Sequence, residues 1–310
     1  TRVAIIGTGS AAFAAAIRAA EAGAEVTVIE AGTTGGTCVN VGCVPSKIFI
    51  RAAHIAHLQS AHPFPGIGKH RAAVDRKALV AQQQARVEEL RHAKYESILD
   101  SNPRIKLERG FARFKNAHTL LVKTADGSEK EIAADRILIA TGRSPHIPDT
   151  PGLGATPYWT SSEALVADEL PHHLIVHGGS VVALELAQAY LRLGSRVTLI
   201  ARGRLLSKED PALGEALQIV LQDEGMRILT DTQIESVRFD GELFHADTGS
   251  EVVSADRLLV ASGRKPNTAG LDLANAGVDT DASGAVIVDD HLRTSAPHVY
   301  AAGDCTNAPQ

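Results

Sequence analysis

The sequence predicts an α/β protein made of two similar halves, because one pattern of residues occurs twice. Residues 3–32 read VAIIGTGSAAFAAAIRAAEAGAEVTVIEAG, and residues 174–203 read LIVHGGSVVALELAQAYLRLGSRVTLIARG. Each stretch contains an apolar strand, a turn of small residues, a helix rich in Ala or Leu, and a second apolar strand. This is the order of a βαβ dinucleotide-binding unit. A second repeat, ADRILIATGRSP at 134–145 and ADRLLVASGRKP at 255–266, predicts one further strand for each half.

We therefore expect two Rossmann-like dinucleotide-binding domains. The first is predicted to be discontinuous, built from residues 1–150 and 272–310, and the second to span residues 151–271. The first half carries an extra segment between its two repeats, and this segment holds two of the three cysteines and a long helical stretch. Chemistry specific to the first half is expected there.

Composition limits the classes of function. The chain has 310 residues, a length that predicts about two domains, and 44% hydrophobic and 22% charged residues are usual for a globular protein. The net charge is −5 and no basic block stands out, which predicts neither a nucleic-acid nor a membrane partner. The apolar runs have strand length, so we expect no transmembrane helix. The chain starts directly in a strand, so no signal peptide is expected, and three cysteines make no disulfide framework. Cytoplasmic location is the expectation.

The turn in each βαβ unit follows the dinucleotide fingerprint. Its first position allows a sharp turn, its second lets a pyrophosphate approach the backbone, and its third lets helix and strand pack closely. The pyrophosphate would then face free N–H groups and the positive end of the helix. For either copy alone, a tight turn that binds nothing is the alternative. The fingerprint residues are Gly7, Gly9 and Ala12 in the first copy and Gly178, Ser180 and Ala183 in the second.

The second strand of each unit ends differently, which predicts different nucleotides. The first copy ends in Glu30, a carboxylate placed to accept hydrogen bonds from ribose hydroxyls, as in FAD or NAD sites. The second copy has Ala201 followed by Arg202, and this exchange favours the 2′-phosphate of NADPH over NADH. The alternative is that Arg202 is an ordinary surface charge.

The stretch GGTCVNVGCVPSK, residues 35–47, suggests a redox pair formed by Cys38 and Cys43. Residues five apart in a regular helix are separated by about 7.5 Å along its axis, whereas disulfide Cα atoms usually lie about 4.4–6.8 Å apart. The pair therefore requires a break in the helix, which Gly42 would permit. A helix beginning near Pro45 would favour a thiolate at its N-terminus, and Lys47 would add to that effect. A structural zinc site and inert buried cysteines are the alternatives.

These features resemble the flavoprotein disulfide reductases, the family of glutathione reductase and lipoamide dehydrogenase. The resemblance rests on the cysteine motif, the two fingerprints, IATG at 139–142 and AAGDC at 301–305. Four stretches are most similar to the mercuric reductases within that family: KIFIRAAHIAHL (47–58), QQQARVEELRHAKYESIL (82–99), PYWTSSEAL (157–165) and GSVVALELAQAY (179–190). The resemblance covers essentially the whole chain.

The resemblance implies roles for individual residues. Cys43 would be the thiol nearest the flavin and Cys38 the exchanging one, both binding Hg(II). Lys47 would lie near the flavin and pair with Glu185, and Tyr95 would flank the metal site. The FAD contacts implied are Ala12, Gly32, Thr37, Lys47, Ala112, Thr141, Gly142 and Asp304.

Simpler roles stay open for several of these residues. Glu185 could be a helix-surface carboxylate, Tyr95 a core residue, and Asp304 a helix cap. Cys305 is expected to be a buried small residue. His54 and His57 lie one helical turn apart, but no further ligands can be named, so no metal site is expected there.

The function implied is NADPH-dependent reduction of Hg(II) to Hg(0) through FAD and the two thiols, which are natural ligands for a soft cation. One alternative is a reductase of organic disulfides. Another is a flavin- and thiol-bearing module that binds soft metal without turnover. The chain stops just after AAGDC, where the family continues into a C-terminal dimerisation domain, so a homodimer is expected only if that domain is present.

Overall fold

The computed structural model describes residues 1–306 and 308, and these form two compact units. The first unit comprises residues 1–40, 86–144 and the described part of 264–310, and the second comprises residues 41–85 and 145–263. Each unit contains one of the predicted βαβ repeats around a parallel sheet. The predicted α/β fold is therefore confirmed.

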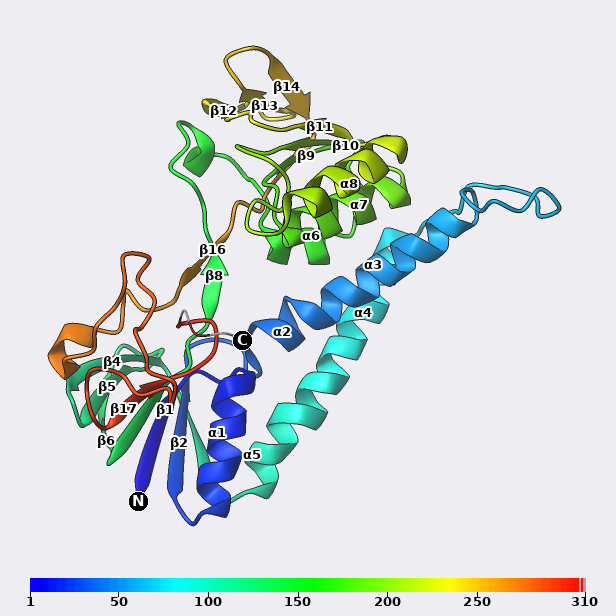
Figure 1. The fold of residues 1–310 in the computed structure, drawn as a ribbon. Coiled ribbons are helices and arrows are strands. Elements are labelled where there is room, and N and C mark those ends of the chain that lie inside the picture. The colour runs from blue at the N-terminus through cyan, green and yellow to red at the C-terminus, as the bar shows by residue number, and fades with distance from the viewer. Residues whose placement is uncertain (307, 309–310) are drawn as a thin grey trace. The chain divides into compact units, whose positions relative to one another are not determined.

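The first unit is built on a five-stranded parallel sheet in the order β17-β7-β1-β2-β3. In sequence order its strands are β1 (Arg2–Ile6), β2 (Glu25–Glu30), β3 (Ile105–Arg109), β7 (Arg136–Ile139) and β17 (Val299–Ala301). Helix α1 (Ser10–Glu21) lies along β1 and β2 (Figure 1). Since side chains alternate along a strand, Ile5 packs with the alanines of α1, while Ala4 and Ile6 pack on the opposite face.

An antiparallel meander covers that opposite face. It consists of β4 (Phe111–Asn116), β5 (Thr119–Lys123) and β6 (Glu129–Ala133). Phe114 and Leu120 from the meander are fully buried in the cluster that contains Ala4 and Ile6. The unit also contains α2 (Gly36–Asn40), α5 (Ser97–Ser101), the 3₁₀ helix η3 (Leu273–Ala276) and the paired short strands β8 (Arg143–Pro145) and β16 (Arg264–Pro266).

The second unit repeats this plan with four parallel strands in the order β11-β10-β9-β15. These are β9 (His173–His177), β10 (Arg196–Ile200), β11 (Arg227–Leu229) and β15 (Arg257–Val260). Leu174 and Val176 of β9 face helix α7 (Val181–Leu193), and Ile175 faces a second meander. That meander is formed by β12 (Ser236–Phe239), β13 (Phe244–Asp247) and β14 (Val252–Ala255). The two repeats thus bury equivalent positions in equivalent layers.

Four helices complete the second unit's core. Helix α6 (Ser161–Val166) starts at Thr160 with a capping box to Glu163, and α8 (Pro211–Asp223) is capped by the Asp210 carboxylate. The 3₁₀ helix η2 (Leu153–Ala155) packs with β12, and Leu153 is fully buried. Helix α3 (Cys43–Leu58) packs on α7 through Phe49, which meets the Tyr190 ring edge-on.

The segment 41–85 therefore belongs to the second unit by its packing, although the sequence assigned it to the first nucleotide domain. The reason is the long apolar contact between α3 and α7, which buries Phe49 and Ala53 of α3. Helix α4 (Arg76–Arg91) begins in this unit. Arg76 is 4% exposed; it donates to the carbonyls of Ala164 and Leu165 and covers the ring of Phe49 at 4.3 Å.

The long helical stretch expected in the extra segment is not regular throughout. After α4, residues His92–Glu96 form a π-helical turn, and α5 follows directly. Such turns insert one residue into the helical repeat and so rotate the side chains that follow. Tyr95 lies in this turn and is 8% exposed.

The described residues contain no helix long and apolar enough to cross a membrane. Over the same residues, no group of three or more His, Cys, Asp or Glu side chains is arranged to hold a metal ion.

His177 breaks the equivalence of the two repeats, because the matching residue in the first unit is the apolar Ile6. Its ring nitrogen Nδ1 is buried without a hydrogen-bond partner. Burial, and secondarily the positive charge of Arg202, lower the pKa of His177 to about 4. Between pH 6.5 and about 4, His177 is therefore protonated in the unfolded chain and neutral in the folded chain.

We predict that His177→Ile reduces acid sensitivity. The wild type should lose roughly 3 kcal/mol of unfolding free energy more than the variant as the pH falls from 6.5 to 4. Urea unfolding at several pH values measures this, with His291→Gln on an exposed turn as the control for loss of a surface histidine. Parallel profiles for the wild type and His177→Ile would contradict the expectation.

Candidate active site

Each of the two fingerprint turns makes the same kind of close backbone contact within its own unit. Gly7 has φ of +108°, and a Cβ on it would lie 2.4 Å from the carbonyl oxygen of Ala140, at the end of β7. Gly178 has φ of +144°, and its Cβ would lie 2.3 Å from the carbonyl oxygen of Ala261, just after β15. Only glycine fits either position, and both turns open at the carboxyl edge of their sheet, where dinucleotides bind in this class of fold.

The first unit has the groups expected at an adenosine site. Glu30, at the end of β2, accepts from the Thr8 hydroxyl and from the amide of Gly32 at 2.7 Å. A Cβ on Gly36 would lie 2.7 Å from the Cα of Gly9, so these two backbones touch. A carboxylate beside a bare glycine turn fits the ribose and pyrophosphate of FAD. The contacts of Gly9 and Glu30 with FAD stay predictions.

The other residues assigned to FAD lie in the loops after β7 and β17, in α1 and α2, and on strand β4 of the meander. Gly32 accepts from Arg109, and the carbonyls of Thr141 and Gly142 accept from Asn267. The amide of Phe114 bonds outward to Leu271, and because peptide groups alternate along a strand, the Ala112 amide points to the same outer edge. Ala12 is buried in α1, Thr37 lies in α2, and Asp304 follows β17. Their contacts with a flavin stay predictions.

The second unit ends its nucleotide strand differently, as the sequence indicated. Ala201 is buried after β10, and Arg202 beside it is exposed. Ser180 donates from its hydroxyl to the carbonyl of Ala261, and Ala183 is fully buried beneath the turn. Arg204 donates to the carbonyls of residues 206, 207 and 209, so its guanidinium holds its own loop. Arg202 is therefore the better placed of these two cations for a 2′-phosphate.

The helix break expected between the cysteines is present. Helix α2 ends at Asn40 and α3 begins at Cys43, with Gly42 at φ −126° and ψ −111° between them. Cys38 and Cys43 are both exposed. Asn40 donates to the carbonyls of Thr34 and Gly36 and accepts from Arg91, which fixes α2. Cys43 is the first residue of α3, where the helix dipole favours negative charge.

Lys47 lies one turn further along α3 and is brought together with Glu185 of α7. Its Nζ lies 2.5 Å from Glu185 Oε1, and the two side chains are 60% and 35% exposed. At that exposure the pair contributes little to stability, about 0–1 kcal/mol. The pairing that the resemblance implied is therefore present, and the role of Lys47 beside a flavin stays a prediction.

Tyr95 packs against the first nucleotide turn. Its ring meets Phe13 of α1 edge-on at 4.9 Å, and its hydroxyl lies 3.3 Å from the Ser10 hydroxyl. A Cβ on Gly35 would lie 3.1 Å from the Tyr95 ring, so this ring supports the glycine turn that precedes Cys38. The π-helical turn aims the side chain there, a feature that the sequence periodicity did not reveal. The metal-flanking role stays a prediction.

Cys305 is fully buried and its Sγ donates to the carbonyl of Ile139. Burial raises the pKa of its thiol. The expectation of a buried small residue is confirmed.

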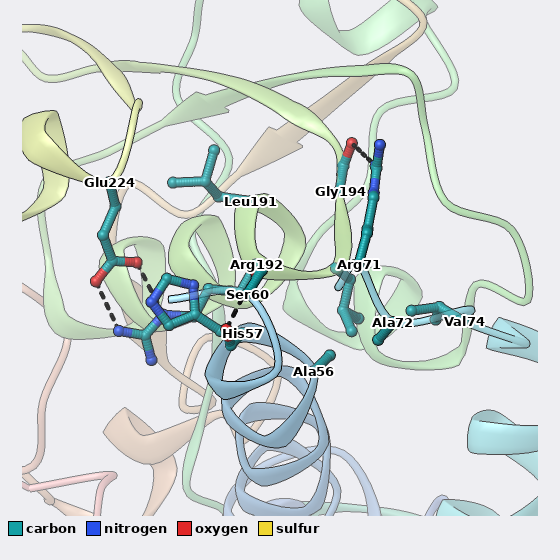
Figure 2. A pocket seen from close by; sticks show the side chains of 11 residues that line it. Ala56, His57, Ser60, Arg71, Ala72, Val74, Leu191, Arg192, Gly194 and Glu224 are labelled. Atoms are coloured by element: carbon teal, nitrogen blue, oxygen red, sulfur yellow. Dashed lines mark hydrogen bonds and ion pairs between the residues drawn. The ribbon is translucent and has the colours of Figure 1, made fainter. Parts of the chain in front are cut away.

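A pocket of about 290 Å³ lies at the other end of α3 and α7 (Figure 2). Arg192 forms a bidentate ion pair with Glu224 there, at 2.6 and 2.8 Å, and Arg192 Nη1 lies 3.5 Å from His54 Nδ1. His54 and Arg192 are separated in sequence by 138 residues, as are Lys47 and Glu185, so α3 and α7 run in the same direction. No sequence motif indicated this pocket, because the pocket depends on how α3 and α7 align.

The chain matches the family described as pyridine nucleotide-disulphide oxidoreductase over residues 1–310. It is 56% identical to the mercuric reductase of Acidithiobacillus ferrooxidans over 310 residues, covering 99% of this chain and 56% of that protein. It is also 56% identical to the mercuric reductase of Shewanella putrefaciens, with the same coverage. The flavoprotein disulfide reductase RclA of Escherichia coli, in a Cu(II) complex, has a TM-score of 0.90 at 31% identity and is covered to 67%.

The chain therefore belongs to the pyridine nucleotide-disulphide oxidoreductase family. The family uses FAD and a nicotinamide nucleotide. Within it, the chain is a homologue of the mercuric reductases, and it spans about 56% of the length of the first two of these relatives.

We predict that Gly178→Ala damages the second nucleotide site. The added methyl group would collide with the Ala261 carbonyl, so we expect a loss of about 2 kcal/mol or more in unfolding free energy and weakened NADPH binding. Thermal unfolding and fluorescence titration with NADPH measure the two effects. Gly154→Ala is the matched control, because a Cβ there meets no heavy atom within 4 Å. Equal behaviour of the two variants would contradict the expectation.

Proposed function

We propose that this chain is the nucleotide- and thiol-bearing part of an NADPH-dependent mercury(II) reductase. The observation that carries the proposal is the pair of exposed cysteines on either side of a helix break, in a chain 56% identical to mercuric reductases. The overall reaction is Hg(II) + NADPH → Hg(0) + NADP⁺ + H⁺, in which the hydride supplies both electrons.

The thiols supply the affinity for the substrate. Thiolates are soft ligands and bind a soft cation such as Hg(II) in preference to carboxylates or water. Both Cys38 and Cys43 are open to solvent, so a mercury ion can reach either sulfur without movement of a buried group. Cys43 lies at the N-terminus of α3, where the helix dipole favours negative charge. Lys47 adds positive charge on the same face one turn later.

The two sheet edges would bind the nucleotides. Glu30 and the turn at Gly7 and Gly9 would hold FAD, which when bound supplies two-electron redox chemistry between the nicotinamide and the thiols. The turn at Gly178 and Ser180 would hold NADPH, with Arg202 at its 2′-phosphate. Glu185 holds the Lys47 ammonium in place. This pair would position charge beside the flavin.

We predict that the two thiols are both required. Cys38→Ser and Cys43→Ser should each lower NADPH-dependent release of volatile mercury by roughly 100-fold or more, because groups that act as a unit fail together. The assay follows NADPH absorbance with thiol-complexed HgCl₂ and traps the metal vapour. Cys305→Ala is the matched control, since its buried sulfur lies in the core and should leave turnover intact.

The same assay separates the proposal from its alternatives. Glutathione disulfide and lipoamide serve as parallel substrates, and faster turnover of either one would assign the chain to organic disulfides. Tight Hg(II) binding with no turnover of any substrate would make it a binding module. Full mercury turnover in Cys38→Ser would exclude the thiol mechanism.

We predict that Arg202→Ala selectively weakens NADPH. Loss of a charge-assisted bond to the 2′-phosphate should raise the NADPH dissociation constant roughly 10- to 100-fold and leave NADH binding unchanged. Titration with both nucleotides tests this. Arg238→Ala, which also removes an exposed cation, here from β12, is the control. A parallel loss of both nucleotides would show that Arg202 supports the fold of the site instead.

A further inference from the structure

Three polar side chains form a hydrogen-bonded chain on the meander of the second unit. His245 Nδ1 lies 2.9 Å from Ser254 Oγ, and His245 Nε2 lies 2.6 Å from Asp240 Oδ2. Ser254 is on β14 and His245 is on β13, while Asp240 lies in the turn between β12 and β13. The proposed mercury chemistry uses none of these three residues.

The meander places the serine and the histidine side by side on its outer face. His245 is directly opposite Ser254 in the antiparallel register. Their neighbours Phe244 and Ala255 are buried in the apolar cluster that includes Ile175 of β9. Because side chains alternate along a strand, His245 and Ser254 point away from that core. Directly opposed residues have Cβ atoms about 4.5–5.5 Å apart, so the sheet itself brings these two side chains into contact.

The Asp240 carboxylate is held in place and ionised. Its Oδ1 accepts from the amides of Leu243 at 2.8 Å and Glu242 at 3.0 Å, which leaves Oδ2 for His245. Hydrogen bonds from the Leu243 amide, the His245 ring and the Glu242 amide hold the pKa of Asp240 below its usual range. An ionised carboxylate only accepts hydrogen bonds, so His245 Nε2 carries the proton in this contact.

This proton fixes the role of the serine. A neutral imidazole has one N–H group, so a proton on Nε2 leaves Nδ1 of His245 as an acceptor. The Ser254 hydroxyl is then the donor in the contact at 2.9 Å. Ser254 is partly exposed, and so a molecule from solvent can reach its oxygen. A hydroxyl that donates to an imidazole, which is itself oriented by a carboxylate, is an activated nucleophile.

We propose that Ser254 is the nucleophile of a separate active site, which transfers the acyl group of an activated ester to water with His245 as the base. Ser254 Oγ attacks the carbonyl carbon while His245 Nδ1 takes the hydroxyl proton. The bond to the leaving alcohol breaks, and His245 returns the proton to that alcohol. Water then attacks the acyl-serine in the same way and releases a carboxylic acid, so no oxidant or reductant is needed. Asp240 is a positioning residue, because it fixes the tautomer of His245 and touches no substrate.

The surroundings of Ser254 limit the acyl donor. Val252 precedes Ser254 by two residues on the same face of β14 and is 56% exposed, so a small apolar acyl group can lie on it. The sheet face is open, so water hydrates the oxyanion that forms during attack, and the gain from a preorganised site is small. We therefore expect slow turnover of donors with good leaving groups, such as aryl esters of short carboxylic acids.

The test is hydrolysis of p-nitrophenyl acetate by the double variant Cys38→Ser with Cys43→Ser. Exposed thiols also attack such esters, so their removal isolates the serine. In this background Ser254→Ala should lower the rate of nitrophenol release roughly 100-fold or more. Ser236→Ala is the matched control, because Ser236 alternates with the buried Val237 and so lies on the same outer face, on β12. Mass spectrometry of the trapped intermediate should place the acetyl group on Ser254.

Two further variants separate chemistry from folding. Asp240→Asn keeps an oxygen for the two amides but presents an NH₂ group to His245, which moves the ring proton to Nδ1 and prevents acceptance from Ser254. We expect kcat to fall roughly 100-fold or more with KM unchanged, and the nitrogen NMR signals of the His245 ring to report the change of tautomer. His245→Ala should lose a similar factor and regain activity when imidazole is added.

Several results would overturn the proposal. They are hydrolysis no faster than in buffer, an acetyl group on a residue other than Ser254, an equal loss in the Ser236→Ala control, and full activity or an unchanged tautomer in Asp240→Asn. Because the background lacks both thiols of the cysteine motif, none of these readouts depends on mercury turnover.

Discussion

The architecture depends on a backbone contact that occurs once in each unit. A strand ends, the chain turns through a glycine with positive φ, and the turn presses against the carbonyl after a neighbouring strand. This contact leaves no room for a side chain at Gly7 or Gly178. It places a helix N-terminus at the carboxyl edge of the sheet, so both nucleotide sites rest on the same steric requirement.

One helix, α3, connects the cysteine motif to the second nucleotide-binding unit. Helix α3 carries Cys43 at its start and Lys47 one turn later, and it packs along α7, which supplies Glu185. Because the helices run in the same direction, the ion pair at one end and the contact of His54 with Arg192 at the other keep the same register. The arrangement of charge near Cys43 is thus fixed by packing far from it.

The repeats and the cysteine motif predicted three strands of each parallel sheet, the turns and the helix break from local chemistry alone, but neither the remaining strands nor the meanders. What they missed depends on pairs of residues far apart in the chain. The packing of α3 on α7 moved segment 41–85 to the second unit, and the π-helical turn around Tyr95 has no periodic signature. The alignment of the repeats places His177 opposite the apolar Ile6. That its Nδ1 has no hydrogen-bond partner depends on the layers packed around it. The roles of the individual site residues toward FAD are inferences from resemblance.

The buried guanidinium of Arg76 has a consequence for the integrity of the chain. It anchors the first residue of α4 to the carbonyls of α6 and to the ring of Phe49, directly after a long run of exposed residues. A peptide bond cut by trypsin at Lys69 would therefore leave both new ends attached to the same core. The second unit is built so that its backbone can be nicked at this loop while its halves stay assembled, which also makes the loop a natural place to open a circularly permuted chain.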